Sequence, residues 1–406
     1  MTTSRKFFLV SQVFYPDETS TASLFTDLAL SLAREHDVSV EVWCAQPSYS
    51  TTQRQPARVV FKGVTIRYLW STNFPKSNLF GRLINYATFS VSLCLKLLFS
   101  KDTSPVFTVT NPPFLGVLIL ALCKLKRGRY LYIVHDVYPD GLVRLGRLSQ
   151  KGLIVRIWSF FNKRVLRNAE TIIIIGRDMY EWVRKTDPSA ESKIEYIPHW
   201  QNEELISPVE FESNLFVREH SLHGKFVVQY AGNMGLWHDM KSLALAAQSL
   251  ENEGVFFCFI GDGIRRQDLF DSWQDKIPSN TLVLPFQPTE RIGESLTACH
   301  AALISLREGL EGIAVPCKLY GILASGVPVI AQVPEPSEIA LAVKEDKCGI
   351  VVPPGDVEAL VKAIIYLKEH IEIRKEMAAN ARRAFENKYT TKQAAKRYCE
   401  ILLNTS

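Results

Sequence analysis

The segment from Ser305 to Lys318, SLREGLEGIAVPCK, gathers side chains that could hold a phosphorylated sugar. Glu308 and Glu311 offer carboxylates that can accept hydrogen bonds from sugar hydroxyls. Pro316 suits the first turn of a following helix, where its missing N–H costs nothing, and leaves the next amides and Lys318 to face an anion such as a phosphate. The alternative is a solvated lysine at a helix start beside a charged surface loop, because short motifs of this kind are unspecific.

Two further strand ends carry glycines where a helix is expected to begin. The run Gly232-Asn233-Met234-Gly235 follows one apolar segment, and Gly261 and Gly263 flank an aspartate after the next. Glycine lets a backbone approach a ligand closely, and open amides at a helix start attract an anion. A turn that simply requires a positive φ angle is equally consistent with either motif taken singly.

Short apolar runs alternate with helical-period segments along the whole chain, which is the pattern of βα units around parallel sheets. Strands are expected at 6–12, 38–44, 64–70, 105–110, 129–135, 171–176 and 193–198, and then at 225–235, 255–263, 280–286, 300–306, 327–332 and 348–354. The two series predict an α/β protein with two Rossmann-like doubly wound domains that face each other, with ligands beyond the carboxyl ends of the strands. We expect a first domain at 1–205, a second at 206–385 and a C-terminal helix at 386–406 that packs back on the first.

Length and composition agree with two globular domains in a reducing compartment. A chain of 406 residues is long for one core, and 47% hydrophobic with 22% charged residues is ordinary globular usage. The net charge of +5 is mild, and no basic-aromatic module indicates a nucleic-acid partner. Eight cysteines are scattered singly, so a cytoplasmic protein is expected.

Two apolar segments of the sequence are candidates for membrane spans. Residues 79–99 contain Arg82, Asn85 and Lys96, and residues 114–123 fall short of the roughly 20 apolar residues that a span requires. Neither is expected to cross a bilayer.

Four motifs follow one another in the order and rough spacing of a known family: YAGNMG, IGDGIRR, LPFQP and VPCKLYGILASGVPVIA. They resemble family 4 of the retaining glycosyltransferases, whose GT-B fold has two facing Rossmann domains. The opening segment FYPDETSTASLFTDLALSLAREHDVSVEVWCAQP resembles the family's first strand, loop and helix, and HDVYPDG and YIPHWQN resemble segments of members that build bacterial surface polysaccharides. The resemblance covers nearly the whole chain.

The resemblance implies a nucleotide-sugar donor on the second domain and an acceptor on the first. The catalytic residues that it implies are His135, Asp136 and Glu308; the donor-binding residues are Gly232, Asn233, Gly261, Arg265, Leu284, Phe286, Glu311, Cys317, Lys318 and Leu319. It also implies that the leaving diphosphate itself helps to deprotonate the acceptor, while fixed dipoles and cations stabilise the developing negative charge. No metal and no cofactor are expected, and the chain has no D-x-D pair. His135 could equally be an ordinary hydrogen-bonded residue at a strand end, and Asp136 a loop-capping one.

The chain departs from the family pattern at several places. Where many members have a Gly-Gly pair it has DETSTAS, so that Thr19, Ser20 and Thr21 could supply hydroxyl donors instead. The family's arginine and lysine after the YAG strand fall on Asn233 and about His238, which shifts phosphate stabilisation to Lys318 and to Arg265 or Arg266. The glutamate that commonly holds the ribose aligns with Gly321, and ribose recognition stays unassigned.

Two segments of the first domain combine apolar and cationic residues. They are residues 79–99 and the run KGLIVRIWSFFNKRVLRNAE at 151–170, with CKLKRGR as a third basic patch. This pattern suits peripheral contact with the inner face of an anionic membrane, whereas an amphipathic core helix with a solvated basic face is the common alternative.

The sequence therefore predicts a metal-independent retaining transferase that moves a sugar from a nucleotide donor, with UDP favoured over GDP, to a polyprenyl-diphosphate-linked glycan. Its products would belong to a surface polysaccharide such as O-antigen, capsule or exopolysaccharide. A sugar-nucleotide epimerase built of two Rossmann domains and a non-catalytic binding protein with the same fold remain as alternatives.

Overall fold

The computed structural model describes residues 6–36, 38–51, 53–74 and 79–404. Its contacts divide the chain into two compact units. Unit 1 comprises Met1–His199 and Thr391–Ser406, and unit 2 comprises Trp200–Thr390. The divisions thus fall after residues 199 and 390, whereas the sequence suggested boundaries after 205 and 385. The two ends of unit 2 are joined to each other, because the amide of Gln201 donates to the carbonyl of Tyr389 (2.9 Å).

Within the described residues, unit 1 has a sheet of eight strands in the order β3-β4-β2-β1-β5-β6-β7-β8. Its strands are β1 Lys6–Val10, β2 Ser39–Cys44, β3 Val59–Phe61, β4 Val64–Tyr68, β5 Val106–Val109, β6 Tyr130–Val134, β7 Thr171–Ile174 and β8 Ile194–Tyr196. All neighbours run parallel except β3 and β4. The short edge strand β3 is the one strand of this sheet that the sequence did not predict.

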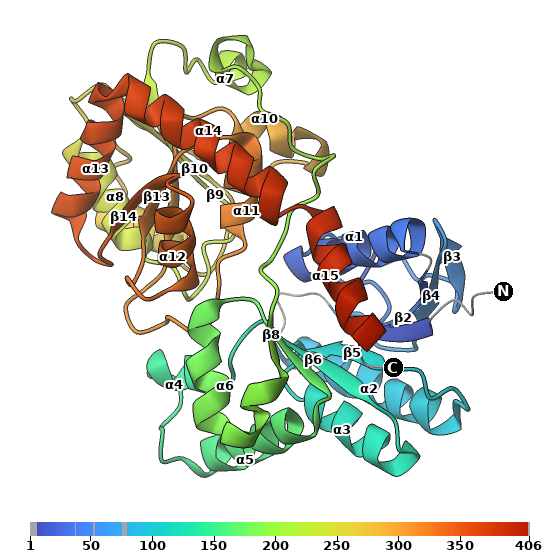
Figure 1. Cartoon of the computed structure of the whole chain (residues 1–406). Helices are drawn as coiled ribbons and strands as arrows, with labels where there is room; N and C mark the ends of the chain where they lie inside the picture. Colours follow the sequence, from blue (N-terminus) through green and yellow to red (C-terminus); the bar gives the residue numbers. More distant parts are fainter. Residues whose placement is uncertain (1–5, 37, 52, 75–78, 405–406) are drawn as a thin grey trace. The chain divides into compact units, whose positions relative to one another are not determined.

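The helices of unit 1 connect these strands, and most of them lie on the two faces of the sheet. They are α1 Ser20–Glu35, α2 Leu79–Phe99, α3 Leu115–Lys126, α4 Asp140–Arg144, α5 Leu153–Asn168, α6 Tyr180–Thr186 and α15 Thr391–Asn404. The C-terminal helix α15 packs beside α1 (Figure 1). It begins afresh at Thr391, so the amphipathic C-terminal segment that looked like one helix in the sequence is two, α14 in unit 2 and α15 in unit 1.

Unit 2 has a fully parallel sheet of six strands among the residues described, in the order β11-β10-β9-β12-β13-β14. The strands are β9 Phe226–Ala231, β10 Val255–Ile260, β11 Thr281–Leu284, β12 Ala301–Ser305, β13 Val329–Gln332 and β14 Gly349–Val352. This is the doubly wound strand order of a dinucleotide-binding domain. The chain adds β10 and β11 on one side of β9 and then β12, β13 and β14 on the other side, so the order of the strands reverses between β9 and β12. Loops after these two strands are therefore where a ligand is expected.

The helices of unit 2 are α7 Leu215–Glu219, α8 Met240–Ser249, α9 Gln267–Ser272, α10 Ile292–Leu296, α11 Lys318–Ser325, α12 Glu338–Glu345, α13 Val357–Glu369 and α14 Ile371–Lys388. Local sequence explains their ends. The side chain of Asp239 caps α8, that of Ser337 caps α12 and that of Asp356 caps α13. Gly326 ends α11 in the left-handed region, at φ +65°. The core of the unit is formed by fully buried residues of β9, β10 and α8 among others.

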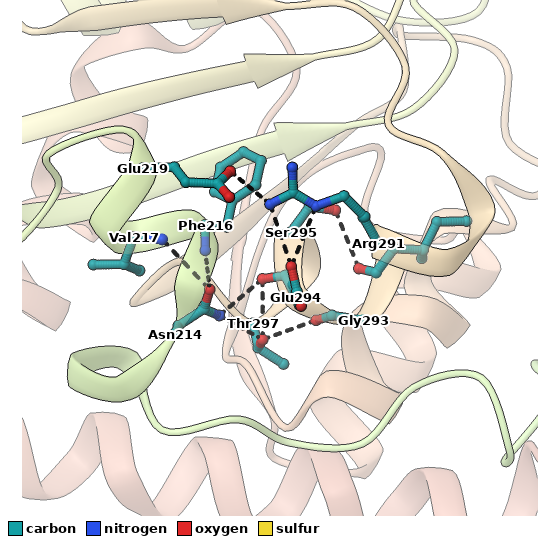
Figure 2. A network of polar contacts seen from close by, with 10 residues as sticks. Asn214, Phe216, Val217, Glu219, Arg291, Gly293, Glu294, Ser295 and Thr297 are labelled. Carbon is teal, nitrogen blue, oxygen red and sulfur yellow. Dashed lines mark hydrogen bonds and ion pairs between the residues drawn. The ribbon is translucent and has the colours of Figure 1, made fainter.

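A polar network joins the start of unit 2 to α10, as Figure 2 shows. Asn214 caps α7 by accepting from the amide of Phe216 (2.8 Å), while its amide group donates to the carbonyl of Glu294 (2.8 Å) and to the hydroxyl of Thr297 (2.9 Å). Nearby, Arg291 pairs with Glu219 (2.6 Å). Because Asn214 is almost fully buried, its loss would remove the capping acceptor of the amides of Phe216 and Val217.

Candidate functional site

Two glycines at the carboxyl edge of the unit 2 sheet bring their loops into direct contact. Gly232 follows β9 with φ +121°, and Gly261 follows β10 with φ +129°. The amide of Gly232 donates to the carbonyl of Ile260 (2.8 Å). A Cβ atom on Gly261 would lie only 2.2 Å from the carbonyl oxygen of Gly232. Both the backbone angle and the space therefore require glycine at Gly261.

Lys318, the first residue of α11, reaches into this corner. Its Nζ donates to the carbonyl of Asn233 (2.8 Å) and lies 5.1 Å from the centre of the Tyr230 ring. Its Cε would be 3.0 Å from a Cβ on Gly232. The structure thus brings together Gly232, Asn233, Gly261 and Lys318, four of the residues that the sequence singled out. We call this group the glycine–lysine corner. Burial lowers the pKa of Lys318 to about 8.

His238 orients this lysine and is itself neutral. Its Nδ1 lies 2.6 Å from the carbonyl of Ser305, and a carbonyl can only accept, so Nδ1 carries the proton. Nε2 is then free to accept from the ammonium of Lys318, 3.3 Å away. Burial and the charge of Lys318 lower the pKa of His238 to about 3. Position 238 is thus a hydrogen-bond acceptor for the lysine of α11 and adds no charge of its own.

Sequence reasoning missed Tyr230, Ser305 and the role of His238. The hydroxyl of Tyr230 donates to the same Asn233 carbonyl (2.9 Å) that Lys318 contacts. Ser305 is fully buried, and its hydroxyl accepts from the amide of Asp239 (2.6 Å). Their positions in the sequence could have indicated both residues, because Tyr230 and Ser305 lie near the carboxyl ends of β9 and β12, the two strands between which the strand order reverses.

The remaining predicted donor residues frame the corner in different ways. Cys317 precedes α11 and its side chain caps none of the first amides, while its carbonyl accepts from the amide of Tyr320 (3.3 Å). The side chain of Leu319 is fully buried, and only its backbone can face a ligand. The carbonyl of Leu284 accepts from the amide of Gly261 (2.9 Å). Phe286, just after β11, has 55% of its surface exposed and is open to stacking.

Arg265 and Glu308 line a cavity of about 590 Å³ within unit 2. The other lining residues are Asp239, Lys241, Asp268, Asp271, Ser272, Arg307, Pro354 and Gly355. Arg265 is held by Asp268, with 3.1 Å between Nε and Oδ2. The lining does not include Gly232, Gly261 or Lys318. The amide of Arg265 nevertheless donates to the carbonyl of Met234 (2.9 Å), the residue after Asn233, so this charged cavity adjoins the glycine–lysine corner. Glu311 lines neither and is half-buried.

In unit 1, His135 and Asp136 follow β6 and are fixed by one threonine. Both amides donate to the hydroxyl of Thr110, at 3.2 and 3.1 Å. The His135 ring stacks on Phe25 (5.4 Å between centres) and meets His199 edge-on (4.7 Å). Burial lowers the pKa of His135 to about 4 and raises the pKa of Asp136 to about 6. Near neutral pH the imidazole is therefore uncharged and the carboxylate is mostly ionised.

The first loop of unit 1 is built around Asp17 and Thr19. The carboxylate of Asp17 accepts from the amides of Tyr49 (2.9 Å) and Ser50 (3.0 Å). The hydroxyl of Thr19 accepts from the amide of Ala22 and caps α1. This bond uses one of the two acceptor lone pairs of the hydroxyl and leaves its proton available for donation.

Helix α2 carries a large apolar surface. Phe80, Val91, Leu95 and Phe99 each have more than half of their surface exposed, whereas Phe89 and Leu93 are fully buried. Among the residues described, Phe80–Phe99 is the one helix that is long and apolar enough to cross a membrane by length and composition, and 22% of its apolar 18-residue stretch is buried. The polar residues Arg82, Asn85 and Lys96 thus do not disqualify the segment by that measure, contrary to the expectation from the sequence.

Two family models match the chain and together span most of it. The description "Glycosyl transferase 4-like domain" matches residues 21–200, and "Glycosyl transferases group 1" matches residues 213–384. A probable glycosyltransferase WbjE of Pseudomonas aeruginosa is 28% identical over 72% of this chain and 74% of its own length. A putative colanic acid biosynthesis glycosyl transferase WcaI of Escherichia coli is 23% identical over 73% of this chain and 75% of the relative.

Solved structures share the fold. Anabaena Alr3699/HepE, solved in complex with UDP and glucose, superimposes with a TM-score of 0.74 at 14% identity, covering 98% of this chain and all of the other. The two parallel-sheet units and the match define a GT-B protein. The chain belongs to the family 4 type of glycosyltransferases.

Proposed function

We propose that this glycosyltransferase moves a sugar from a nucleoside diphosphate sugar, with UDP favoured over GDP, to a lipid-linked glycan in bacterial surface polysaccharide synthesis. The observation that supports the donor assignment is the glycine–lysine corner at the carboxyl edge of the unit 2 sheet. It combines an ammonium group, a glycine backbone and open helix amides at the position where such sheets bind ligands. The solved relative with UDP and the relative named for colanic acid biosynthesis agree with this choice.

In the proposed reaction the donor's bond from the anomeric carbon to the diphosphate breaks while the acceptor oxygen bonds to the same carbon with retention. The diphosphate leaves with the electron pair and takes up the acceptor's proton. Lys318 and the first amides of α11 would stabilise its negative charge as it develops. This arrangement supplies positive charge from the chain itself, and the proposal includes no metal and no cofactor.

The other predicted residues take their roles from the same proposal. Glu308 or Glu311 would accept hydrogen bonds from the donor sugar, Arg265 would add charge near the phosphates, and Phe286 would stack on the base. His135 and Asp136 would contact the sugar or acceptor from unit 1. Since glycosyltransferase models match both halves of the chain, they favour transfer over the epimerase alternative.

A thermal-shift screen tests the donor assignment. UDP binds the native state alone under the proposal, so 100 times its Kd should stabilise the protein by about 2.7 kcal/mol. GDP should have a smaller effect, and Lys318→Ala should abolish most of the UDP effect. Equal shifts with and without Lys318 would contradict the assignment. Transfer of radiolabelled sugar from the best donor to a membrane extract then separates an enzyme from a binding protein.

Peripheral membrane contact through α2 completes the proposal and places the protein in the cytoplasm at the inner membrane face. The exposed apolar residues of α2 would enter the interfacial region, and the basic residues of unit 1 would meet anionic lipid. Vesicles with anionic lipid should therefore pellet the protein, and salt should weaken this. Leu95→Glu with Phe99→Glu should release it, while Ile371→Glu, at an apolar residue of unit 2 that is about as exposed as Leu95, should not. If the amount of protein that pellets does not depend on the lipid, this part of the proposal is wrong.

A further inference from the structure

A second cavity lies in unit 1 among α4, α5 and α6. Its volume is about 430 Å³, within the range of small-molecule sites. It is lined by Asp140, Arg156, Ser159, Phe160, Asn162, Lys163, Trp182, Lys185 and Thr186. We call it the α5 pocket.

The charge of the α5 pocket is net positive. Arg156, Lys163 and Lys185 contribute three cations, against the single carboxylate of Asp140. Within the part of the chain that the structure describes, none of these cations has a carboxylate within ion-pair distance, whereas Arg184 on the same helix as Lys185 is paired with Glu181. Oδ2 of Asp140 accepts from the indole N–H of Trp182 (3.3 Å), so a protein donor already satisfies part of that charge. Unpaired cations around a cavity favour an anionic ligand, and phosphate is the common one.

The rest of the lining suits a carbohydrate. Phe160 and Trp182 present aromatic rings, and the carboxylate of Asp140 and the amide of Asn162 offer hydrogen-bonding groups. Sugar hydroxyls require such acceptors and donors, while the apolar face of a sugar ring packs on an aromatic ring. Cations together with rings and a carboxylate therefore match a phosphorylated sugar better than a bare phosphate.

The α5 pocket is physically continuous with the loop that carries His135 and Asp136. Nδ2 of Asn162 donates to the carbonyl of Tyr138, two residues after Asp136. Asp140, which starts α4, lies two residues further along the same loop. The ring of Tyr138 also stacks on Trp158 of α5, with 6.0 Å between centres. A ligand in the pocket would thus contact the helix that fixes the candidate catalytic loop.

The outer surface of α5 beside the pocket is apolar. Leu153 and Ile154, one turn before the pocket residues, have 72% and 62% of their surface exposed. Leu125 of the neighbouring helix α3 has 70% exposed. A ligand with a phosphorylated head and a hydrocarbon chain could place the head in the pocket and the chain on this surface.

We propose that the α5 pocket binds the sugar diphosphate at the reducing end of the lipid-linked acceptor, as an exosite remote from the group that receives the new sugar. This proposal rests on the proposed function, because it concerns the acceptor of the same reaction. Arg156, Lys163 and Lys185 bind the diphosphate, Phe160 and Trp182 pack on the first sugar, and Asp140 accepts from its hydroxyls.

The exosite is tested by titrating farnesyl diphosphate into the protein in a calorimeter, with UDP present at a saturating concentration. The UDP occupies the donor site, so the remaining heat reports a second diphosphate site. The double variant Arg156→Gln, Lys163→Gln should bind the probe at least tenfold more weakly. Arg164→Gln removes another exposed cation of the same helix, which lies over the Phe160 ring and does not line the pocket, and this variant should bind the probe normally.

Two results would overturn the proposal. Equal affinity in all three proteins would mean that the pocket cations do not contact the diphosphate. Displacement of the probe by vesicles of phosphatidylglycerol, but not by vesicles of phosphatidylcholine, would show that the pocket receives bulk phospholipid headgroups and is no acceptor site.

The test separates the exosite from the donor site. If UDP fails to bind the wild-type protein, the proposed function fails whatever the probe does. If UDP binds but farnesyl diphosphate binds all variants alike, the proposed function stands and the exosite is wrong.

Discussion

The glycine–lysine corner of unit 2 and the α5 pocket of unit 1 both offer cations, but they hold them in opposite ways. In the corner one lysine is half-buried, donates to a backbone carbonyl and contacts a neutral histidine. In the pocket Arg156, Lys163 and Lys185 are exposed. A fixed cation in a partly dry site can stabilise charge that develops during a reaction, whereas mobile exposed cations chiefly attract and retain an anion. The difference suggests chemistry at the corner and capture at the pocket.

The largest effect is expected from Gly261→Ala, which would disrupt the glycine–lysine corner and leave the α5 pocket unchanged. The new Cβ would meet the carbonyl of Gly232 at 2.2 Å in a backbone conformation that alanine avoids. We expect a loss of at least about 3 kcal/mol in the free energy of unfolding and loss of nucleotide binding. Gly224→Ala is the control, because its φ is also positive at +71° but nothing lies within 4 Å; it should cost about 1 kcal/mol. Similar unfolding midpoints for the two variants would argue against the close approach of the Gly232 carbonyl to Gly261.

The alkaline side of the pH profile should distinguish the two kinds of cation. Because the pKa of Lys318 is lowered to about 8, its charge is present below that pH and is lost above it. The kcat/KM for the donor should therefore fall about tenfold per pH unit above pH 8. The arginine in Lys318→Arg keeps its charge at these pH values, so the kcat/KM of this variant should be lower than that of the wild-type protein but should not decline above pH 8. Persistence of the decline in the arginine variant would assign it to another group.

The acid side of the same profile should report on Asp136. The pKa of this carboxyl is raised to about 6 by burial, while the pKa of His135 is lowered to about 4. If the carboxylate form is required, kcat/KM should fall below pH 6. His135→Gln should keep that decline, and Asp136→Asn should abolish it together with most of the activity. The opposite pattern would give the role to the histidine.

The smallest expected effect concerns Asn214, which lies in neither cationic region. Asn214→Ala removes a helix cap and two buried hydrogen bonds, at a cost of about 2 kcal/mol. Thermal unfolding should shift by roughly 4–8 °C, while the KM for the donor stays unchanged. Ser213→Ala, with one exposed hydroxyl contact, should change the midpoint by less than a quarter of that. A raised KM in the Asn214 variant would show that α7 and α10 influence the donor site.

Much of the fold follows from local sequence, since long apolar runs bounded by glycine and proline mark most strands. The short edge strand Val59–Phe61 was missed because its apolar run is only three residues long and lies between Arg58 and Lys62. The break at Tyr389 between α14 and α15 was missed because helical periodicity continues on both sides.

The candidate site was predictable where the chain itself sets the geometry. Gly232, Gly261 and Lys318 lie at strand ends and a helix start, so a doubly wound sheet must bring them to one edge. The neutral state of His238 depends on burial and on the Ser305 carbonyl, which come from distant segments. Likewise α5 was seen as an amphipathic helix, but nothing local shows that Asp140 and Lys185 close a pocket beside it.

Calorimetric titration of UDP into the wild-type protein and Lys318→Ala tests the central claim most directly. The account predicts saturable binding to the wild-type protein and at least a hundredfold weaker binding to the variant, at a pH below 8 where the lysine is charged. Equal affinity in both proteins would contradict it, because the diphosphate would then lie away from the glycine–lysine corner.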